Sequence, residues 1–134
     1  MKRVMLSLFV MVMLSCLKGQ NNTFTDINAG LQGVSSSSVA WGDYDNDGDL
    51  DILVIGYSGS DYISKVYCNN GNSSFTDINA GLMGTNGSAS WGDFDNDGDL
   101  DILLAGFNFN GVRISKIYRN NGNNSFSDIN ANLP

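Results

Sequence analysis

The sequence predicts an all-β protein, and three observations lead to that class. No stretch after Gln20 shows the 3.6-residue apolar periodicity of an amphipathic helix. The apolar runs are short, rich in β-branched and aromatic residues, and bounded by Gly, Asn, Asp and Ser. The chain also repeats itself with a period of about 51 residues, which is typical of small structural units packed side by side.

The first 19 residues are expected to be a signal peptide. Two cationic residues precede an apolar run at residues 4–15, which has the length of a signal-peptide core and is too short to span a bilayer. We therefore expect an exported protein, either secreted or attached to the cell surface. Cys16 follows Met-Leu-Ser, which resembles a bacterial lipobox, so a lipid anchor at Cys16 is the alternative to cleavage near Gly19.

Recurring motifs set the frame of the repeat. The segment FTDINAG begins at Phe24 and Phe75, and its variant FSDINAN begins at Phe126, so both steps are 51 residues. WGDYDNDGDLDILVIG begins at Trp41, and WGDFDNDGDLDILLAG begins at Trp91. Beyond the signal peptide, these motifs divide the chain into an outer strand with its loop and two repeats: residues 20–37, 38–87 and 88–134.

Each repeat contains four short strand patterns. The first holds SVAW, DILVIG, ISKVYCN and SSFTDI, and the second holds SASW, DILLAG, ISKIYRN and NSFSDI. Asn70-Gly71 and Asn121-Gly122 predict hairpin turns with positive φ. The serine-containing stretches 35–38 and 85–88 are expected to be connecting loops.

Four antiparallel strands in a unit of this length favour β-propeller blades over a β-solenoid. We expect two four-stranded blades, at residues 38–79 and 88–130, plus one extra strand at residues 23–27 that belongs to an adjoining blade. A propeller ring takes about four to eight blades. Two blades therefore predict an incomplete propeller or a fragment of one, and we expect the open outer strands to allow self-association or to meet missing blades of a longer chain.

Composition excludes several kinds of chemistry. The 134-residue chain has a formal net charge of −7, no His, and 14 acidic residues, all of them Asp. Without His, a Ser-His-Asp triad or an imidazole-bound metal is excluded, and the few basic residues give no footprint for nucleic acid. Only Cys68 remains beyond the signal peptide, so no intramolecular disulfide is available to hold the domain together.

Ten of the 14 acidic residues lie in two nine-residue loops, 43–51 and 93–101. Such crowding predicts a bound hard cation, and an all-oxygen ligand shell favours Ca²⁺ over Mg²⁺, about one ion per repeat. Gly48 and Gly98 permit the sharp turn. The predicted ligands are the carboxylates at the first, third, fifth and ninth positions with the backbone carbonyl at the seventh: Asp43, Asp45, Asp47, Asp49 (carbonyl), Asp51, Asp93, Asp95, Asp97, Asp99 (carbonyl) and Asp101.

Two other interpretations of these loops fit the sequence less well. An EF-hand needs a bidentate Glu at the twelfth position, where this chain has Val54 and Leu104. The flanking segments are also strands rather than helices. A solvated turn needs one Asp and one Gly, not five carboxylates repeated twice. Calcium binding is therefore the preferred interpretation.

The two WGD(Y/F)DNDGDLDIL segments resemble the FG-GAP/VCBS-type repeats of integrin-α-like β-propellers. The resemblance covers nearly all of the chain after Phe24 and implies that the D-x-D-x-D-G-x-x-D loops bind calcium between two strands of a blade. The family's Phe-Gly and Gly-Ala-Pro signatures stand here in altered form, as Trp41-Gly42 and Leu104-Ala105-Gly106. This departure favours the VCBS branch over integrin-like ligand recognition.

The expected function is therefore a calcium-binding module for cell adhesion or for binding a protein or glycan ligand, without catalysis. The alternative is an accessory propeller region of a larger secreted enzyme, again with no catalysis in this chain. We expect no nucleic-acid partner and no membrane-spanning segment. Trp41 and Trp91 are expected to pack between blades rather than bind sugars, and Tyr67 and Tyr118 are expected in the core.

Overall fold

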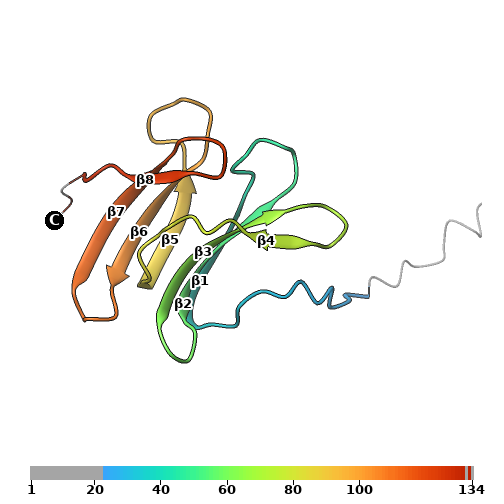
Figure 1. Ribbon diagram of the computed structural model, residues 1–134, viewed down its shortest axis with the longest axis horizontal. Helices are drawn as coiled ribbons and strands as arrows, with labels where there is room; N and C mark the ends of the chain where they lie inside the picture. Colours follow the sequence, from blue (N-terminus) through green and yellow to red (C-terminus); the bar gives the residue numbers. More distant parts are fainter. Residues whose placement is uncertain (1–22, 132, 134) are drawn as a thin grey trace, which may run out of the picture.

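The computed structural model describes residues 23–131 and 133, and within them every regular element is a strand. The strands form two four-stranded antiparallel sheets, in the orders β1-β2-β3-β4 and β5-β6-β7-β8 (Figure 1). The prediction of two antiparallel four-stranded blades is confirmed. The bounds are β1 Ser35–Gly42, β2 Asp51–Tyr57, β3 Tyr62–Asn69, β4 Phe75–Asp77, β5 Asn86–Gly92, β6 Asp101–Phe107, β7 Arg113–Asn120 and β8 Phe126–Asp128.

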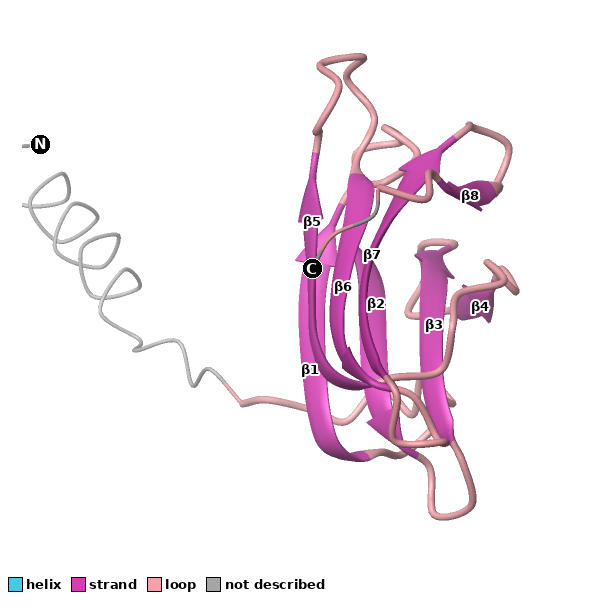
Figure 2. Ribbon diagram, turned by 90° about the vertical axis from the view of Figure 1, so that its left-hand side faces the viewer, coloured by secondary structure: helices cyan, strands magenta, loops and turns pink. Residues whose placement is uncertain are grey.

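The predicted signal peptide at residues 1–19, with Cys16, lies outside the described residues. Among the described residues no helix is long and apolar enough to cross a membrane. Figure 2 shows the two sheets from the side, with strands and loops making up the whole described part of the chain.

Three local predictions of secondary structure are wrong. Residues 23–27 are not a strand. Phe75 and Phe126 pair with Asn69 and Asn120 of the strand before them, whereas no described strand precedes Phe24, whose side chain is fully exposed. Strands β1 and β5 also begin inside stretches that were expected to be loops, because Ser35 pairs with Tyr57 and Asn86 pairs with Phe107 across the sheet. Strand pairing overrides the weak strand preference of the small polar residues in these stretches.

The core lies between the two sheets. It contains Leu53, Ile55 and Val66 from the first sheet and Ile102 and Leu104 from the second, all fully buried. Next to this core, the Ser38 hydroxyl of β1 lies 3.4 Å from the Ala89 amide nitrogen of β5. Alternation along each strand sends one face of each blade into this core and the other face outward.

The two predicted core tyrosines are buried, and each fixes a connecting segment. The Tyr118 hydroxyl accepts a hydrogen bond from the Met83 amide at 3.1 Å, in the connection between the blades. The Tyr67 hydroxyl accepts one from the Gln32 amide at 3.2 Å, in the segment that precedes the first blade. The segment before the first blade is therefore held in the same way as the connection between the blades.

The hairpins between β3 and β4 and between β7 and β8 turn through positive φ as expected, but not at the expected asparagines. In the first hairpin Gly71 has a φ of 73°, and positive φ continues through Asn72 and Ser73. In the second hairpin Gly122 has a φ of 72°, followed by Asn123 and Asn124. The glycine prediction is confirmed, whereas Asn70 and Asn121 do not have positive φ.

Candidate metal centres

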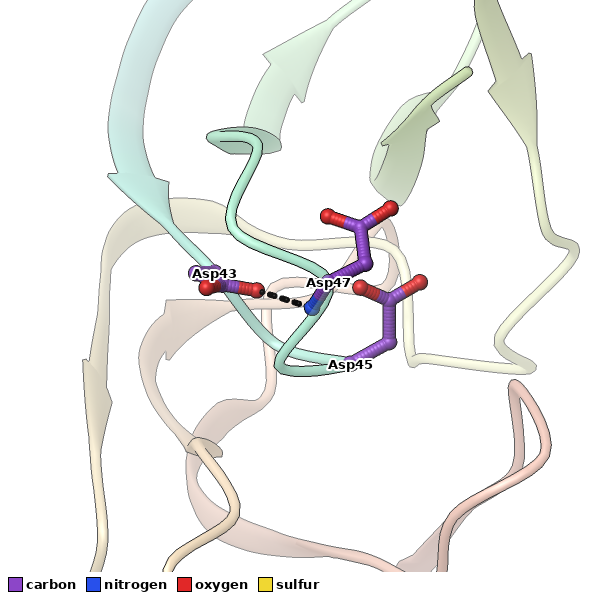
Figure 3. A group of neighbouring side chains, drawn as sticks. All are labelled: Asp43, Asp45 and Asp47. Atoms are coloured by element: carbon purple, nitrogen blue, oxygen red, sulfur yellow. Dashed lines mark hydrogen bonds between the residues drawn. The ribbon is translucent and has the colours of Figure 1, made fainter. Parts of the chain in front are cut away.

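The first aspartate loop connects β1 to β2. Asp43, Asp45 and Asp47 each bring one carboxylate oxygen within 4.8 Å of the others (Figure 3). Positive φ at Asn46 (60°) and Gly48 (93°) produces the turn that brings them together. The predicted role of Gly48 is confirmed, and Asn46 contributes a second left-handed position that asparagine tolerates well.

Backbone amides of the same loop hold two of these carboxylates in place. The two oxygens of Asp43 accept hydrogen bonds from the amides of Asp47 at 3.0 Å and Gly48 at 3.1 Å. The Asp47 Oδ1 atom accepts one from the Asp49 amide at 2.8 Å. The turn is therefore fixed by its own acidic side chains, which explains why aspartate rather than a longer glutamate occupies these positions.

The second loop, between β5 and β6, has the same internal bonds. Asp93 accepts from the amides of Asp97 and Gly98, each at 3.1 Å, and Asp97 accepts from the Asp99 amide at 2.9 Å. Here the oxygens that lie within 4.8 Å of one another belong to a different set, namely Asp93, Asp95 and Asp101.

The ninth residue of each loop is a buried carboxylate. Asp51 is 0% exposed and Asp101 is 1% exposed. The oxygens of Asp51 accept from the amides of Tyr44 and Asn69, and those of Asp101 accept from the amides of Phe94 and Asn120. These bonds tie the loop to β3 or β7.

Burial raises the pKa of Asp51 above its usual value. The two amide hydrogen bonds counteract this rise, and the negative charges of Asp45 and Asp47 add to it. A cation among these groups would favour the charged form of Asp51.

One carboxylate oxygen of the second loop has no hydrogen-bond donor, and this bears on whether the loop suits a cation. The Asp95 Oδ1 atom is buried and accepts no hydrogen bond from any described residue. The Asp95 Oδ2 atom lies 2.9 Å from Arg119 Nε. A buried acceptor without a donor is costly, so a hard cation fits this loop.

The predicted ligands are thus brought together only in part. Asp51 and Asp97 lie outside the close groups of their loops, although both belong to the same loops. The Asp99 carboxylate faces the first loop, where its Oδ1 atom accepts from Asn46 Nδ2 at 2.8 Å. The proposed contributions of the Asp49 and Asp99 carbonyls remain predictions.

Sequence reasoning missed two side chains beside the loops. Arg119 pairs with Asp95, and at the matching position of the first repeat Cys68 places its Sγ atom 3.7 Å from Asp45 Oδ2. Aligning the two repeats places Cys68 opposite Arg119, so the sequence already shows that the repeats differ at this position. The sequence does not show that either side chain lies beside an aspartate loop, because that depends on where β3 and β7 pass the turn.

Comparison with known families finds one similarity, and it includes the aspartate loops. Residues 44–104 match the family model described as FG-GAP-like repeat. This stretch is similar to an FG-GAP-like repeat. It includes nearly all of the first aspartate loop and the whole of the second, together with the strands between them, and it confirms the resemblance found in the sequence. No significant match was found among curated proteins or among solved structures.

Proposed function

We propose that this chain is a calcium-binding FG-GAP repeat module of a secreted or surface-attached protein, and that it serves adhesion by binding a protein or glycan. One observation carries the calcium proposal. Each of two aspartate loops gathers three carboxylate oxygens within 4.8 Å, in a chain that carries an FG-GAP-like repeat.

The donor set suits calcium better than other biological metals. All candidate ligands are oxygens, and the described residues contain no His and only one Cys. Calcium accepts six to eight oxygen ligands in flexible geometry, whereas magnesium demands fewer protein ligands and keeps more water. The residues that would hold the ions are those predicted from the sequence, Asp43, Asp45, Asp47 and Asp51, with their counterparts Asp93, Asp95, Asp97 and Asp101.

The proposed role of the ions is structural. Each loop joins two neighbouring strands of one blade, and the Asn46–Asp99 hydrogen bond connects the two loops across the blades. A bound ion would neutralise the acidic loop and stabilise the folded state by mass action. The loop carboxylates would then be used as ligands, which leaves no clustered acid and base for catalysis, so we propose a binding rather than an enzymatic role.

Isothermal calcium titration of the calcium-free full chain tests the metal proposal. We expect about two ions per chain for the wild type. Asp45→Asn and Asp95→Asn should each remove or strongly weaken one site, because neither carboxylate is needed to hold its own turn. Asp61→Asn, in the β2–β3 turn, is the matched control and should still bind two ions. No calcium uptake, or uptake that the loop variants leave unchanged, would refute the proposal.

The adhesive role needs a separate test. The purified chain should be applied to immobilised glycans and extracellular-matrix proteins in calcium and in chelator. We expect at least one ligand to retain the chain in a calcium-dependent way. Calcium binding without retention by any ligand would keep the metal proposal and contradict the adhesive one.

A further inference from the structure

The interface between the two blades has one tightly fitted contact. The Trp91 ring of β5 stacks on the Tyr44 ring with centroids 6.1 Å apart and an interplanar angle of 7°. The same indole lies over Gly42 at the end of β1. A Cβ atom built on Gly42 would lie 2.6 Å from Trp91 Cδ1. Glycine is therefore required at position 42 because a tryptophan from the next blade covers it.

Because the sequence repeats, the chain contains a second tryptophan and a second glycine at the matching positions, and neither is covered by another blade. Trp41, the counterpart of Trp91, is 58% exposed instead of packed between blades as predicted. Gly92, the counterpart of Gly42, has no atom within 4 Å of a built Cβ atom. Phe94 replaces Tyr44 and is 40% exposed. Within the described residues, Trp41 therefore has no glycine to cover, and Gly92 has no tryptophan over it.

These open halves lie on the two outward sides of the blade pair. The tryptophan face belongs to the first blade and exposes Val39 and Trp41, whereas Ile52 and Val54, which line the same groove, are buried. The glycine face belongs to the second blade and consists of Gly92, Phe94 and Leu103. Leu103 is 46% exposed, whereas its counterpart in the internal interface, Leu53, is fully buried. Each face thus exposes apolar side chains at positions that the internal interface buries.

Both faces are already shaped for a partner. The tryptophan face borders an apolar groove of about 560 Å³ whose other wall is the segment before the first blade. The Gln32–Tyr67 hydrogen bond holds that segment as Met83–Tyr118 holds the internal connection. The glycine face has a hollow of about 240 Å³ over Gly92 and Phe94. Preformed surfaces lose little conformational freedom on binding.

We propose that copies of this chain associate head to tail, with Trp41 of one copy over Gly92 and against Phe94 of the next. The occupant of each face is a second copy, because the chain itself contains the complementary surface and shows how the two fit. Face packing is preferred to pairing of the outer strands, since β4 and β8 are only three residues long. Such a heterologous contact repeats until it closes a ring or extends as a filament.

The Arg119 side chain lies over the Phe94 ring but leaves Gly92 uncovered. Its guanidinium carbon lies 5.4 Å from the centroid of the Phe94 ring and its Nε atom pairs with Asp95. Gly92 stays uncovered beside it. An incoming tryptophan would therefore meet the open glycine first, as Trp91 meets Gly42 in the internal interface.

Sedimentation velocity of the full chain over a wide concentration range tests the proposal, in a buffer with about 0.15 M salt to screen the acidic loops. We expect the wild type to associate as its concentration rises. Trp41→Ala should weaken association at least about tenfold, as loss of a buried aromatic anchor does. Gly92→Ala should weaken it at least about fivefold, because it adds the atom that the internal contact forbids.

A mixture of the two variants is the decisive control. Trp41→Ala keeps an intact glycine face and Gly92→Ala keeps an intact Trp41, so together they should form one-to-one dimers and nothing larger. The apolar segment at residues 4–15 could also cause association, but it is present in the wild type and in both variants, so its contribution would be the same in all samples. A wild type that stays monomeric would show that another partner, or a further blade, covers these faces, and would overturn the proposal. Association that neither variant weakens would also overturn it, as would a mixture that gains no dimer.

Discussion

Arg119 Nε lies 2.9 Å from Asp95 Oδ2 in the second loop, and the matching position of the first repeat holds an uncharged Cys68. The nine-residue loops differ only at Tyr44 and Phe94. Their surroundings are nevertheless unequal, because one loop has a guanidinium on a candidate ligand and the other does not. A protein cation that pairs with a ligand carboxylate competes with a metal ion for it.

We predict that the two loops bind calcium with different affinities. Arg119→Cys should strengthen the weaker site by about two- to fivefold, a modest change because the Arg119–Asp95 pair is partly exposed. Cys68→Arg should weaken the other site in the same way. Arg113→Cys removes the same charge from the far end of β7 and should change neither site. Calcium titration measures both affinities. Two sites of equal affinity that neither Arg119→Cys nor Cys68→Arg changes would contradict this prediction.

Gly42→Ala and Gly92→Ala should affect folding very differently. The first places a methyl group 2.6 Å from Trp91 Cδ1 and should lower the free energy of unfolding by about 1–3 kcal/mol. The second meets no atom within 4 Å and should leave the unfolding of the isolated chain nearly unchanged. Denaturant unfolding at low protein concentration, where head-to-tail association is absent, measures both. Equal losses would mean that Trp91 does not cover Gly42.

Asn120→Ala should cost more stability than Asn69→Ala. Both side chains accept from a glycine amide and donate to a leucine carbonyl, but Asn120 is 3% exposed and also donates to the Tyr44 carbonyl of the other blade at 2.8 Å. Removing it leaves a buried acceptor without a donor. We expect a loss of about 2–3 kcal/mol for Asn120→Ala and about 1 kcal/mol for Asn69→Ala. Denaturant unfolding that ranks them the other way would contradict the bridging role.

The Lys116–Asp128 ion pair gives a pH-dependent contribution to stability. The hydrogen bond from Lys116 and the amide of Asn130 hold the pKa of Asp128 below its usual value. Because the folded-state pKa is the lower one, the contribution is present above the ordinary aspartate pKa of about 3.9 and is lost as the pH falls further. The stability difference between wild type and Asp128→Asn should therefore be largest near neutral pH and shrink below about pH 4.

Asp26→Asn is the control for that pH series. Asp26 holds the same place in its own FTDIN segment, and its carboxylate accepts from the Asn28 amide, but no described Lys or Arg pairs with it. All unfolding curves should be recorded in chelator, so that calcium release does not add its own pH dependence. An Asp128→Asn effect that is constant from pH 7 to pH 3 would rule out the ion pair as its cause.

The repeat frame, the strands and the aspartate loops could be predicted from the sequence because each depends on local chemistry. Apolar alternation marks strands, and Asp with Gly marks the turn. The aspartates of the second FTDIN segment and of the FSDIN segment have a structural role, because Asp77 pairs with Lys65 and Asp128 pairs with Lys116.

The sequence could not distinguish Trp41 from Trp91, which begin nearly identical segments but have opposite environments. Burial of a blade face depends on whether another blade lies against it, and that is not a local property. The same reason explains the wrong strand at residues 23–27, since a strand forms only beside a partner. Arg119 was missed as a neighbour of Asp95 because the approach of β7 to the loop is set by the sheet.

The most direct test of the account is the unfolding of the full chain in calcium and in chelator, followed by far-UV circular dichroism. No disulfide is available beyond the predicted signal peptide, so calcium in the two aspartate loops should supply stability. We predict that millimolar calcium raises the free energy of unfolding by about 1–3 kcal/mol per site, and that magnesium raises it much less. Unfolding curves that coincide in calcium and chelator would contradict the assignment of the aspartate loops as structural calcium sites.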